Sequence, residues 1–251
     1  YPARHHCHHV IVSNMQATAP KGTMTCIIGR NGTGKSTLLR SIARLQNRLG
    51  GDILLNGHSI DSYAQDEFAR LLSIVLTSRP DAQSMTVYEL VALGRTPYTG
   101  FWGRLSDEDR KIVDHALYMV GMQNMSRRRV CSLSDGECQK VMIAKSLAQG
   151  TPIILLDEPT AFLDFHGKVE LLTLLRRLAH NEGKTILLST HDLEAALQTA
   201  DRLWMLDKDG IHEGEPKLLV ANGDVDRYIG QKGVSVDEDF RIKISVSDNN
   251  N

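Results

Sequence analysis

Residues 29–36 read Gly29-Arg30-Asn31-Gly32-Thr33-Gly34-Lys35-Ser36, and this stretch decides how the rest of the chain is interpreted. It fits the pattern G-x-x-x-x-G-K-[ST], in which glycines let the backbone wrap closely around a phosphate so that successive N–H groups point at the anion. An apolar stretch at residues 23–28 precedes it and an amphipathic stretch from Lys35 to about Leu45 follows, which predicts the strand–loop–helix context that the pattern requires. We expect a phosphate-binding loop in which Lys35 reaches the β- and γ-phosphates and Ser36 holds Mg²⁺. The nucleotide contacts expected here are Gly29, Asn31, Gly32, Gly34, Lys35, Ser36 and Thr37.

A second candidate site follows the short apolar run at residues 153–156, where Asp157 and Glu158 come at once after the last leucine. An adjacent acidic pair alone is more often a solvated turn, but this run is typical of a strand buried on both faces. Ligands of open α/β sheets bind beside the carboxyl ends of the strands. We therefore expect Asp157 to bind Mg²⁺ together with Ser36, and Glu158 to orient or deprotonate the attacking water.

Length and composition limit the class of protein. The 251 residues are 41% hydrophobic, which is enough for a sizeable core in one or two domains. A net charge of −1, from 29 Lys and Arg against 30 Asp and Glu, removes the electrostatic basis for broad nucleic-acid binding. No apolar run approaches the roughly 18 residues of a membrane span, and no secretory signal is visible. Four cysteines without a C-x-x-C pair are typical of a reduced, cytosolic protein, and the cluster His5-His6-Cys7-His8-His9 lacks the second ligand pair that a metal site needs.

Strand-like and amphipathic stretches alternate along most of the chain, which predicts an α/β fold with a largely parallel sheet. Asp61 is expected to cap a helix that runs to Leu72, and Asp209-Gly210 to form a hairpin turn. We expect strands at residues 10–12, 23–28, 52–55, 73–76, 153–156, 185–189 and 203–206, and helices at 35–45, 61–72, 167–180 and 193–200.

The middle segment, residues 86–121, carries helix signals and no convincing strand. A capping-box pattern stands at residues 86–89 before one apolar stretch, and a second stands at residues 106–109 before another. Gly94 and Gly121 follow where the two helices should end. We therefore expect a helical insertion in the α/β core.

Three further motifs resemble those of one family. Residues 133–137 read Leu133-Ser134-Asp135-Gly136-Glu137, which resembles the L-S-G-G-Q signature of ABC-transporter ATPases. Ala161-Phe162-Leu163-Asp164 resembles the D-loop of that family, and Thr190-His191-Asp192 resembles its switch-histidine loop. With the phosphate loop and the acidic strand end, these motifs stand in the family's order and spacing and span nearly the whole chain.

The resemblance implies a fold and a division of the chain. The family has a RecA-like P-loop NTPase core with a mostly parallel sheet, a small antiparallel β part and an inserted helical subdomain. On this basis residues 1–77 and 150–235 form the nucleotide-binding core with its antiparallel part. Residues 78–149 form the helical subdomain with the signature, and residues 236–251 are a C-terminal tail.

The resemblance also implies roles for single residues. Ser134 and Gly136 open a helix whose N-terminus faces the ATP on the phosphate loop of a second copy, so that two chains enclose two ATP molecules. His191 contacts the γ-phosphate, unless it is a capping or core histidine. Asp164 links the two sites across the dimer, although alone it could equally be a helix N-cap. Tyr1 resembles the aromatic that stacks on adenine, with more residues than usual before the loop.

The chain departs from the family pattern at three positions. Thr77 stands where the family usually has Gln, and its hydroxyl can reach Mg²⁺ or water but is shorter than an amide. Asp135 and Glu137 replace the central Gly and the Gln of the signature, which adds negative charge near a phosphate site. Asp135 could point away from it as an N-cap-type residue. The shorter side chain at residue 77 is therefore expected to couple ATP to a permease less firmly than glutamine would.

One stretch, residues 86–106, is similar to the ATPase subunits of importers for iron–siderophore chelates, haem and cobalamin. This implies an ATP-hydrolysing subunit that works with integral-membrane permease subunits, lies peripherally on the cytoplasmic face of the plasma membrane and does not bind nucleic acid. Tyr98, Phe101 and Trp102 suit a surface that buries against a partner, or else a local hydrophobic cluster. The alternatives are a soluble ABC ATPase acting on nucleic acid or ribosomes, and a nucleotide-binding regulator with weak hydrolysis.

Overall fold

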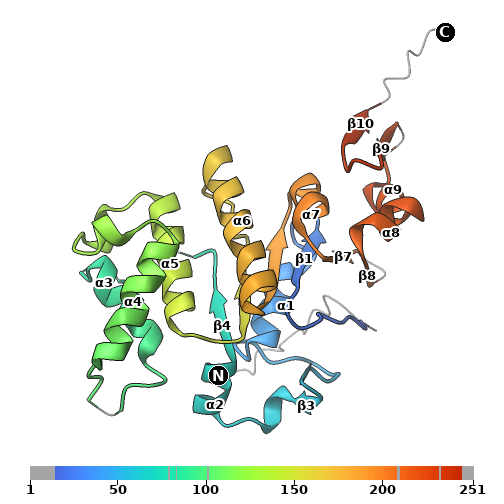
Figure 1. Ribbon diagram of the computed structural model, residues 1–251. Coiled ribbons are helices and arrows are strands. Elements are labelled where there is room, and N and C mark those ends of the chain that lie inside the picture. The colour runs from blue at the N-terminus through green and yellow to red at the C-terminus, as the bar shows by residue number, and fades with distance from the viewer. Residues whose placement is uncertain are drawn as a thin grey trace, which may run out of the picture.

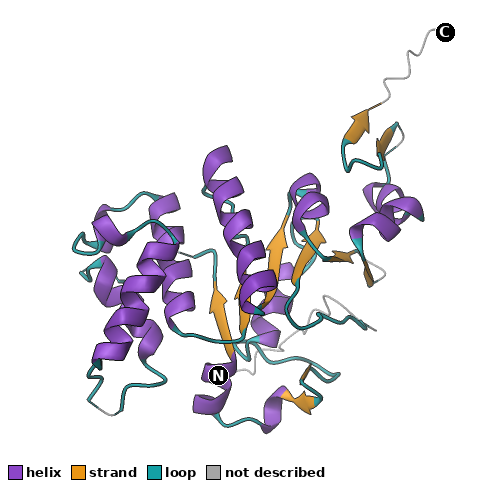
Figure 2. Cartoon of the chain, viewed as in Figure 1, coloured by secondary structure: helices purple, strands orange, loops and turns teal. Residues whose placement is uncertain are grey.

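The computed structural model describes residues 15–78, 80–82, 84–100, 102–207, 210–231 and 233–244. The expected strand at residues 10–12, the His/Cys cluster, Tyr1, Phe101 and Asp209 lie outside this part of the chain. Within it, a central sheet is flanked by helices (Figures 1 and 2). None of the helices in the described ranges combines the length and the apolar character that crossing a membrane needs.

The main sheet has six strands in the order β4-β5-β6-β1-β7-β8. Neighbouring strands from β4 to β7 pair in parallel, and β8 pairs antiparallel with β7 at one edge. This confirms the α/β class and the mostly parallel sheet. The strands are β1 (Met24–Gly29), β4 (Leu72–Val75), β5 (Ile153–Leu156), β6 (Thr185–Thr190), β7 (Arg202–Leu206) and β8 (Ile211–Gly214).

The core lies on both faces of this sheet because successive strand residues point to opposite sides. Cys26 and Ile28 of β1 pack in one apolar cluster with Leu175, while Ile27 between them packs in the other with Leu39. All six residues of β1 are buried, as expected for a strand with parallel neighbours on both sides. The helices that follow these strands are α1 (Lys35–Ile42), α2 (Gln65–Leu71), α6 (Phe165–Glu182) and α7 (Leu193–Thr199).

Three helices pack against one another beside the sheet, at the left of Figure 1. They are α3 (Val87–Ala92), α4 (Asp107–Met119) and α5 (Asp135–Ala148). Both predicted capping boxes are confirmed, at Thr86 before α3 and at Ser106 before α4. Gly121 has a φ of 71° directly after the last turn of α4, which is the left-handed conformation expected of a helix stop.

Gly94 is present for a different reason from the one predicted. After α3 the chain continues as a 3₁₀ turn, Leu93–Arg95, and Gly94 lies inside it without a positive φ. A Cβ at Gly94 would lie 2.3 Å from the carbonyl oxygen of Lys145 on α5. The glycine therefore permits close approach to α5 and does not end a helix.

The expected helix over residues 61–72 is wrong at its start. Asp61 belongs to a 3₁₀ turn, Ile60–Ser62, whose first N–H groups are capped by Ser59, and α2 begins only at Gln65. Asp61 instead forms an ion pair with Arg48. The helix expected to reach Leu45 also ends early, because Arg44 adopts a left-handed φ of 59° after Ile42.

Small antiparallel pairs complete the fold. The strands β2 (Leu54–Leu55) and β3 (His58–Ser59) form a hairpin closed by a turn at Asn56-Gly57. After β8 come α8 (Pro216–Ala221), α9 (Asp224–Ile229) and the hairpin of β9 (Val234–Val236) with β10 (Ile242–Ile244). The tail expected from residue 236 starts at the last residue of β9 and includes β10.

Candidate functional site

The phosphate-loop pattern lies between the end of β1 and the first turn of α1. Gly32 and Gly34 have φ values of 83° and 99°, so both occupy the left-handed region that side chains disfavour. A Cβ on Gly29 would lie 2.3 Å from Thr33 Oγ1, because the loop closes on itself at that point. All three glycines are thus required by the backbone path, and the loop leads directly into the N-terminus of α1 at Lys35.

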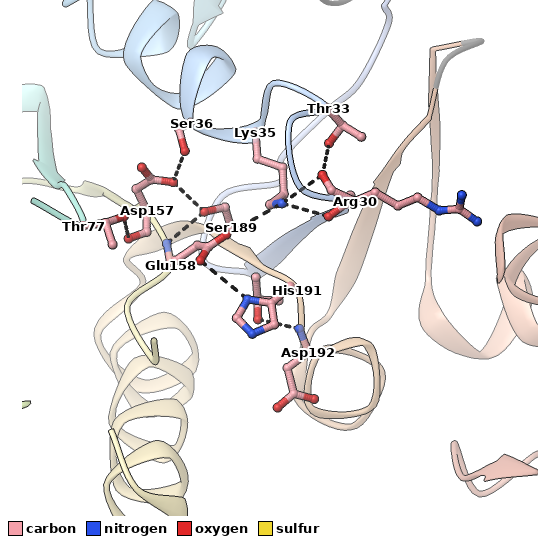
Figure 3. A network of polar contacts seen from close by, with 12 residues as sticks. Arg30, Thr33, Lys35, Ser36, Thr77, Asp157, Glu158, Ser189, His191 and Asp192 are labelled. Atoms are coloured by element: carbon pink, nitrogen blue, oxygen red, sulfur yellow. Dashed lines mark hydrogen bonds and ion pairs between the residues drawn. The ribbon is translucent and has the colours of Figure 1, made fainter. Parts of the chain in front are cut away.

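The Lys35 side chain is held under this loop and is only 5% exposed. Its Nζ donates hydrogen bonds to the carbonyl oxygen of Gly29 at 2.8 Å and to that of Arg30 at 3.4 Å. The same Nζ lies 3.7 Å from Glu158 Oε1 (Figure 3). A positive charge is therefore fixed beside the loop whose N–H groups are arranged for an anion.

Ser36 and Asp157 meet although 121 residues separate them in sequence: the Ser36 hydroxyl donates to Asp157 Oδ1 at 2.8 Å. Asp157 is 2% exposed, and among the described residues its carboxylate has no cationic side chain as a salt-bridge partner. A buried carboxylate commonly needs a positive charge, and a hydroxyl with a carboxylate oxygen is a ligand set that suits Mg²⁺. The residues present therefore fit the expected metal.

Glu158 has an unusual backbone for a residue with a side chain, with a φ of 46°. Its two carboxylate oxygens lie on different partners, Oε1 near Lys35 and Oε2 3.5 Å from His191 Nδ1. The His191 side chain is 57% exposed and projects from the end of β6. The structure thus brings together the three residues that the sequence predicts to be catalytic.

Thr77 lies at the same place, and the contact that its hydroxyl makes is with the backbone after β5. Thr77 Oγ1 donates to the backbone carbonyl oxygen of Asp157 at 2.9 Å. A residue that the sequence analysis missed, Ser189, is also present: its fully buried hydroxyl donates to Asp157 Oδ1 at 2.8 Å and accepts from the Glu158 N–H at 2.9 Å. The sequence feature that could have identified Ser189 as a site residue is its position two residues before His191.

The signature segment opens α5 as predicted, and its N-cap is Ser134 rather than Asp135. Ser134 and Glu137 form a full capping box, with the Ser134 N–H donating to Glu137 Oε2 at 2.8 Å. That hydrogen bond lowers the pKa of Glu137, with a smaller contribution from Arg128 at 3.8 Å. The Glu137 carboxylate, one of the two extra negative charges expected near the phosphate site, is therefore engaged with its own helix terminus.

The D-loop lies against the signature. A Cβ on Gly136 would be 3.2 Å from both the Phe162 carbonyl oxygen and Leu163 Cδ2, so the glycine permits this contact. Asp164 is the N-cap of α6, accepting from the Gly167 N–H at 2.8 Å, which confirms the local alternative. In the part of the chain that the structure describes, no hydrogen bond or ion pair joins Ser134 or Asp164 to the phosphate loop.

Comparisons with known proteins agree with this arrangement. The family model for ABC transporters matches residues 12–161. The iron(3+)-hydroxamate import ATP-binding protein FhuC of Bacillus subtilis is 39% identical over 238 residues, covering 94% of this chain and 88% of the relative. The achromobactin transport ATP-binding protein CbrD of Dickeya dadantii is 44% identical over 194 residues, covering 77% and 72%.

A solved structure is similar over most of its length. It is a dimeric ATP-binding cassette in a post-hydrolysis state bound to ADP and Pi. Its TM-score to this chain is 0.73 and its sequence identity is 27%. The match covers 82% of this chain and 90% of that chain. The phosphate loop, the acidic strand end and the signature occur here in the fold that these proteins share. The chain belongs to the ABC transporter ATPase family.

Proposed function

We propose that this chain is the ATP-hydrolysing subunit of an importer for iron–siderophore or similar metal chelates, working with a separate membrane permease. The observation that carries the ATPase part is the set of contacts joining Lys35, Glu158 and His191 beside the Ser36–Asp157 pair. The chelate class is supported by the relatives, two of which are named as iron(3+)-hydroxamate and achromobactin transport proteins.

Each residue has a chemical task in this proposal. Lys35 and the N–H groups of the loop bind the β- and γ-phosphates, and Ser36 with Asp157 would hold Mg²⁺. Mg²⁺, when bound, neutralises charge on the phosphate oxygens. Glu158 orients the attacking water and accepts its proton, and His191 contacts the γ-phosphate beside it. The distance of 3.5 Å between the Glu158 carboxylate and the His191 imidazole supports their acting on the same phosphate.

The permease partner is supported by a groove of about 640 Å³ on the helical part of the chain. Its lining combines apolar and small polar groups from α3 and the following loop, among them Met85, Leu93, Thr96 and Leu105. Trp102 on the same loop is 82% exposed, whereas Tyr98 packs against the guanidinium of Arg95 at 4.0 Å from its ring centre. Tyr98, which is 40% exposed, thus also packs in the local cluster, and Trp102 is an exposed aromatic of the proposed docking surface.

A second copy of the chain is the other proposed partner. Among the described residues no hydrogen bond or ion pair joins Ser134, at the start of α5, to the chain's own phosphate loop. This supports a helix N-terminus that meets ATP held by another chain. The solved dimeric cassette bound to ADP and Pi supports this assembly.

The test is Glu158→Gln, which keeps the side-chain shape and removes the basic carboxylate. Turnover of ATP with Mg²⁺ should fall by about 10² or more, while binding of ATP persists. A matched control is Glu182→Gln at the C-terminus of α6, far along the helix from the loop. Unchanged turnover in the Glu158 variant would contradict the proposed mechanism, and a wild-type chain without hydrolysis would favour a nucleotide-binding regulator.

A further inference from the structure

The peptide group between Asp157 and Glu158 is held from both sides by side-chain hydroxyls. Its carbonyl oxygen accepts from Thr77 Oγ1 at 2.9 Å, and its N–H donates to Ser189 Oγ at 2.9 Å (Figure 3). Thr77 follows β4 and Ser189 belongs to β6, the two strands that flank β5. The peptide group that joins the two acidic residues is therefore clamped between its neighbouring strands.

This clamp begins where the regular sheet ends. The Asp157 N–H still donates to the backbone carbonyl of Val75 at 2.8 Å, and the last paired residues of β5 and β6 are Leu156 and Leu188. At the next peptide group, the hydroxyls of Thr77 and Ser189 make the hydrogen bonds that backbone groups of neighbouring strands would make in a regular sheet. The next peptide group is thus fixed without the chain continuing as a strand.

The clamp holds the peptide group that leads into an unusual backbone conformation. Glu158 turns out of the extended conformation to a φ of 46°, which a residue with a Cβ adopts only when its surroundings impose it. That turn sends Glu158 Oε1 toward Lys35 and Oε2 toward His191. The direction of this carboxylate therefore depends on the orientation of the peptide group before it.

Ser189 links the two acidic residues directly. Its hydroxyl has one proton, which it gives to Asp157 Oδ1 at 2.8 Å, and a lone pair, which accepts the Glu158 N–H. The side chain is fully buried, so water cannot replace these two hydrogen bonds without rearrangement. One atom thus sets both the rotamer of the metal-binding carboxylate and the backbone of the water-orienting residue.

We propose that Thr77 and Ser189 are positioning residues for ATP hydrolysis: the two hydroxyls fix the peptide group between Asp157 and Glu158 and thereby aim both carboxylates. This rests on the proposed function. It also gives Thr77 a task at a position where the resemblance predicts a glutamine, because a hydroxyl of this length reaches the Asp157 carbonyl.

The first test compares turnover in variants that remove each hydroxyl. Ser189→Ala and Thr77→Val should each lower kcat by about 10- to 100-fold while KM for ATP changes less than about threefold, because the carboxylates are misdirected but the phosphate loop is intact. Thr77→Ser restores the hydroxyl and should recover most of the lost turnover. Because the hydroxyls act on one peptide group, the double variant should lose far less than the product of the two single effects.

The control separates positioning from stability. Ser73 of β4 is also buried, and its hydroxyl is hydrogen-bonded to Ser146 and Thr151 at 2.6 and 2.9 Å, away from the site. Ser73→Ala should lower the unfolding temperature about as much as Ser189→Ala and leave kcat within about twofold of the wild type. Equal losses of kcat in these two variants would overturn the proposal, since they would indicate a general loss of stability.

A second readout does not depend on turnover. In the Glu158→Gln background, calorimetry measures the affinity for ATP with Mg²⁺ and with a chelator, and the ratio is the gain in affinity due to Mg²⁺. Adding Ser189→Ala should reduce this gain several-fold, because Asp157 loses the hydrogen bond from the Ser189 hydroxyl. An unchanged gain, or kcat within twofold of the wild type in both hydroxyl variants, overturns the clamp. Glu158→Gln alone separates the two proposals. If it abolishes turnover, the proposed ATPase function stands even when the clamp is overturned. If it does not, the proposed function itself is contradicted.

Discussion

Replacing Arg95 by methionine is expected to destabilise the helical part of the chain by about 3 kcal/mol. Arg95 is 8% exposed, and its Nε donates to Asp109 Oδ1 at 2.8 Å while Nη1 donates to the Ala148 carbonyl at 2.9 Å. The guanidinium also lies over the Tyr98 ring. One side chain therefore joins the 3₁₀ turn after α3 to the start of α4 and the end of α5.

The magnitude follows from what the substitution leaves behind. Removing one partner of a buried ion pair typically costs about 3–5 kcal/mol, because the remaining charge loses its compensation. The lower end applies here, since Asp109 keeps the hydrogen bonds from Ser106 in the capping box and methionine retains the apolar stem. In a chain of this size about 3 kcal/mol corresponds to a fall of roughly 6–12 °C in the unfolding temperature.

The pH dependence sharpens this test. Hydrogen bonds from Ser106 and Arg95 lower the pKa of Asp109 to about 2. The ionised carboxylate therefore stabilises the folded state fully above the unfolded pKa of about 3.9. This stabilisation decreases as the pH falls toward 2. In the Arg95→Met variant this pKa is lowered less. The stability difference between wild type and variant should therefore stay constant above about pH 4 and shrink as the pH falls from about 4 toward 2.

Thermal unfolding followed by circular dichroism measures both effects, with Arg70→Met as the matched control. Arg70 is exposed and lies over the same tyrosine ring at 5.4 Å, but hydrogen-bonds only to the Pro97 carbonyl among its described partners. Its loss should cost less than about 1 kcal/mol. Equal losses in the two variants, or a difference that does not change with pH, would refute the role assigned to the buried pair.

Two further predictions concern the same helices. Gly94→Ala places a Cβ 2.3 Å from the Lys145 carbonyl oxygen and should lower the unfolding free energy by about 1–3 kcal/mol. In the control Gly100→Ala the new Cβ meets no atom within 4 Å, and the loss should be less than about 0.5 kcal/mol. Denaturant unfolding that gives the same value for both variants would contradict the close approach of Gly94 to α5. Ser134→Arg fills the N-terminus of α5 and should abolish ATP-promoted dimerisation in the Glu158→Gln background, and light scattering that still finds ATP-dependent dimers would exclude that helix terminus from the interface.

Features that depend on neighbouring residues could be predicted from the sequence. The phosphate loop, the strand before Asp157 and the capping boxes at Thr86 and Ser106 each rest on interactions within a few residues. The same capping pattern stands at Ser134 and Glu137, and applying it there would have shown that the Glu137 carboxylate binds its own helix. That feature was available from the sequence and was missed.

Other features depend on contacts between distant segments. Gly94 has the sequence context of a helix stop, but its reason for being glycine is a carbonyl on α5. Thr77 and Asp157 are 80 residues apart, and the pattern around Thr77 does not show which backbone group its hydroxyl meets. Ser189 reads as an ordinary strand residue until the register of β5 with β6 is known. Such positions require the three-dimensional fold.

The place of β1 in the sheet bears on how the chain is synthesised. This fully buried strand is made well before both strands that pair with it, β6 and β7. A growing chain therefore carries two unsatisfied strand edges on β1, a state prone to aggregation and slow to resolve because the pairings are so distant in sequence. Ser189 and His191 arrive with β6. A nascent chain thus gains the first of the two partners of β1 and the last groups of the nucleotide site in the same step. A fragment that ends before β6 should therefore need a chaperone and be unable to consume ATP.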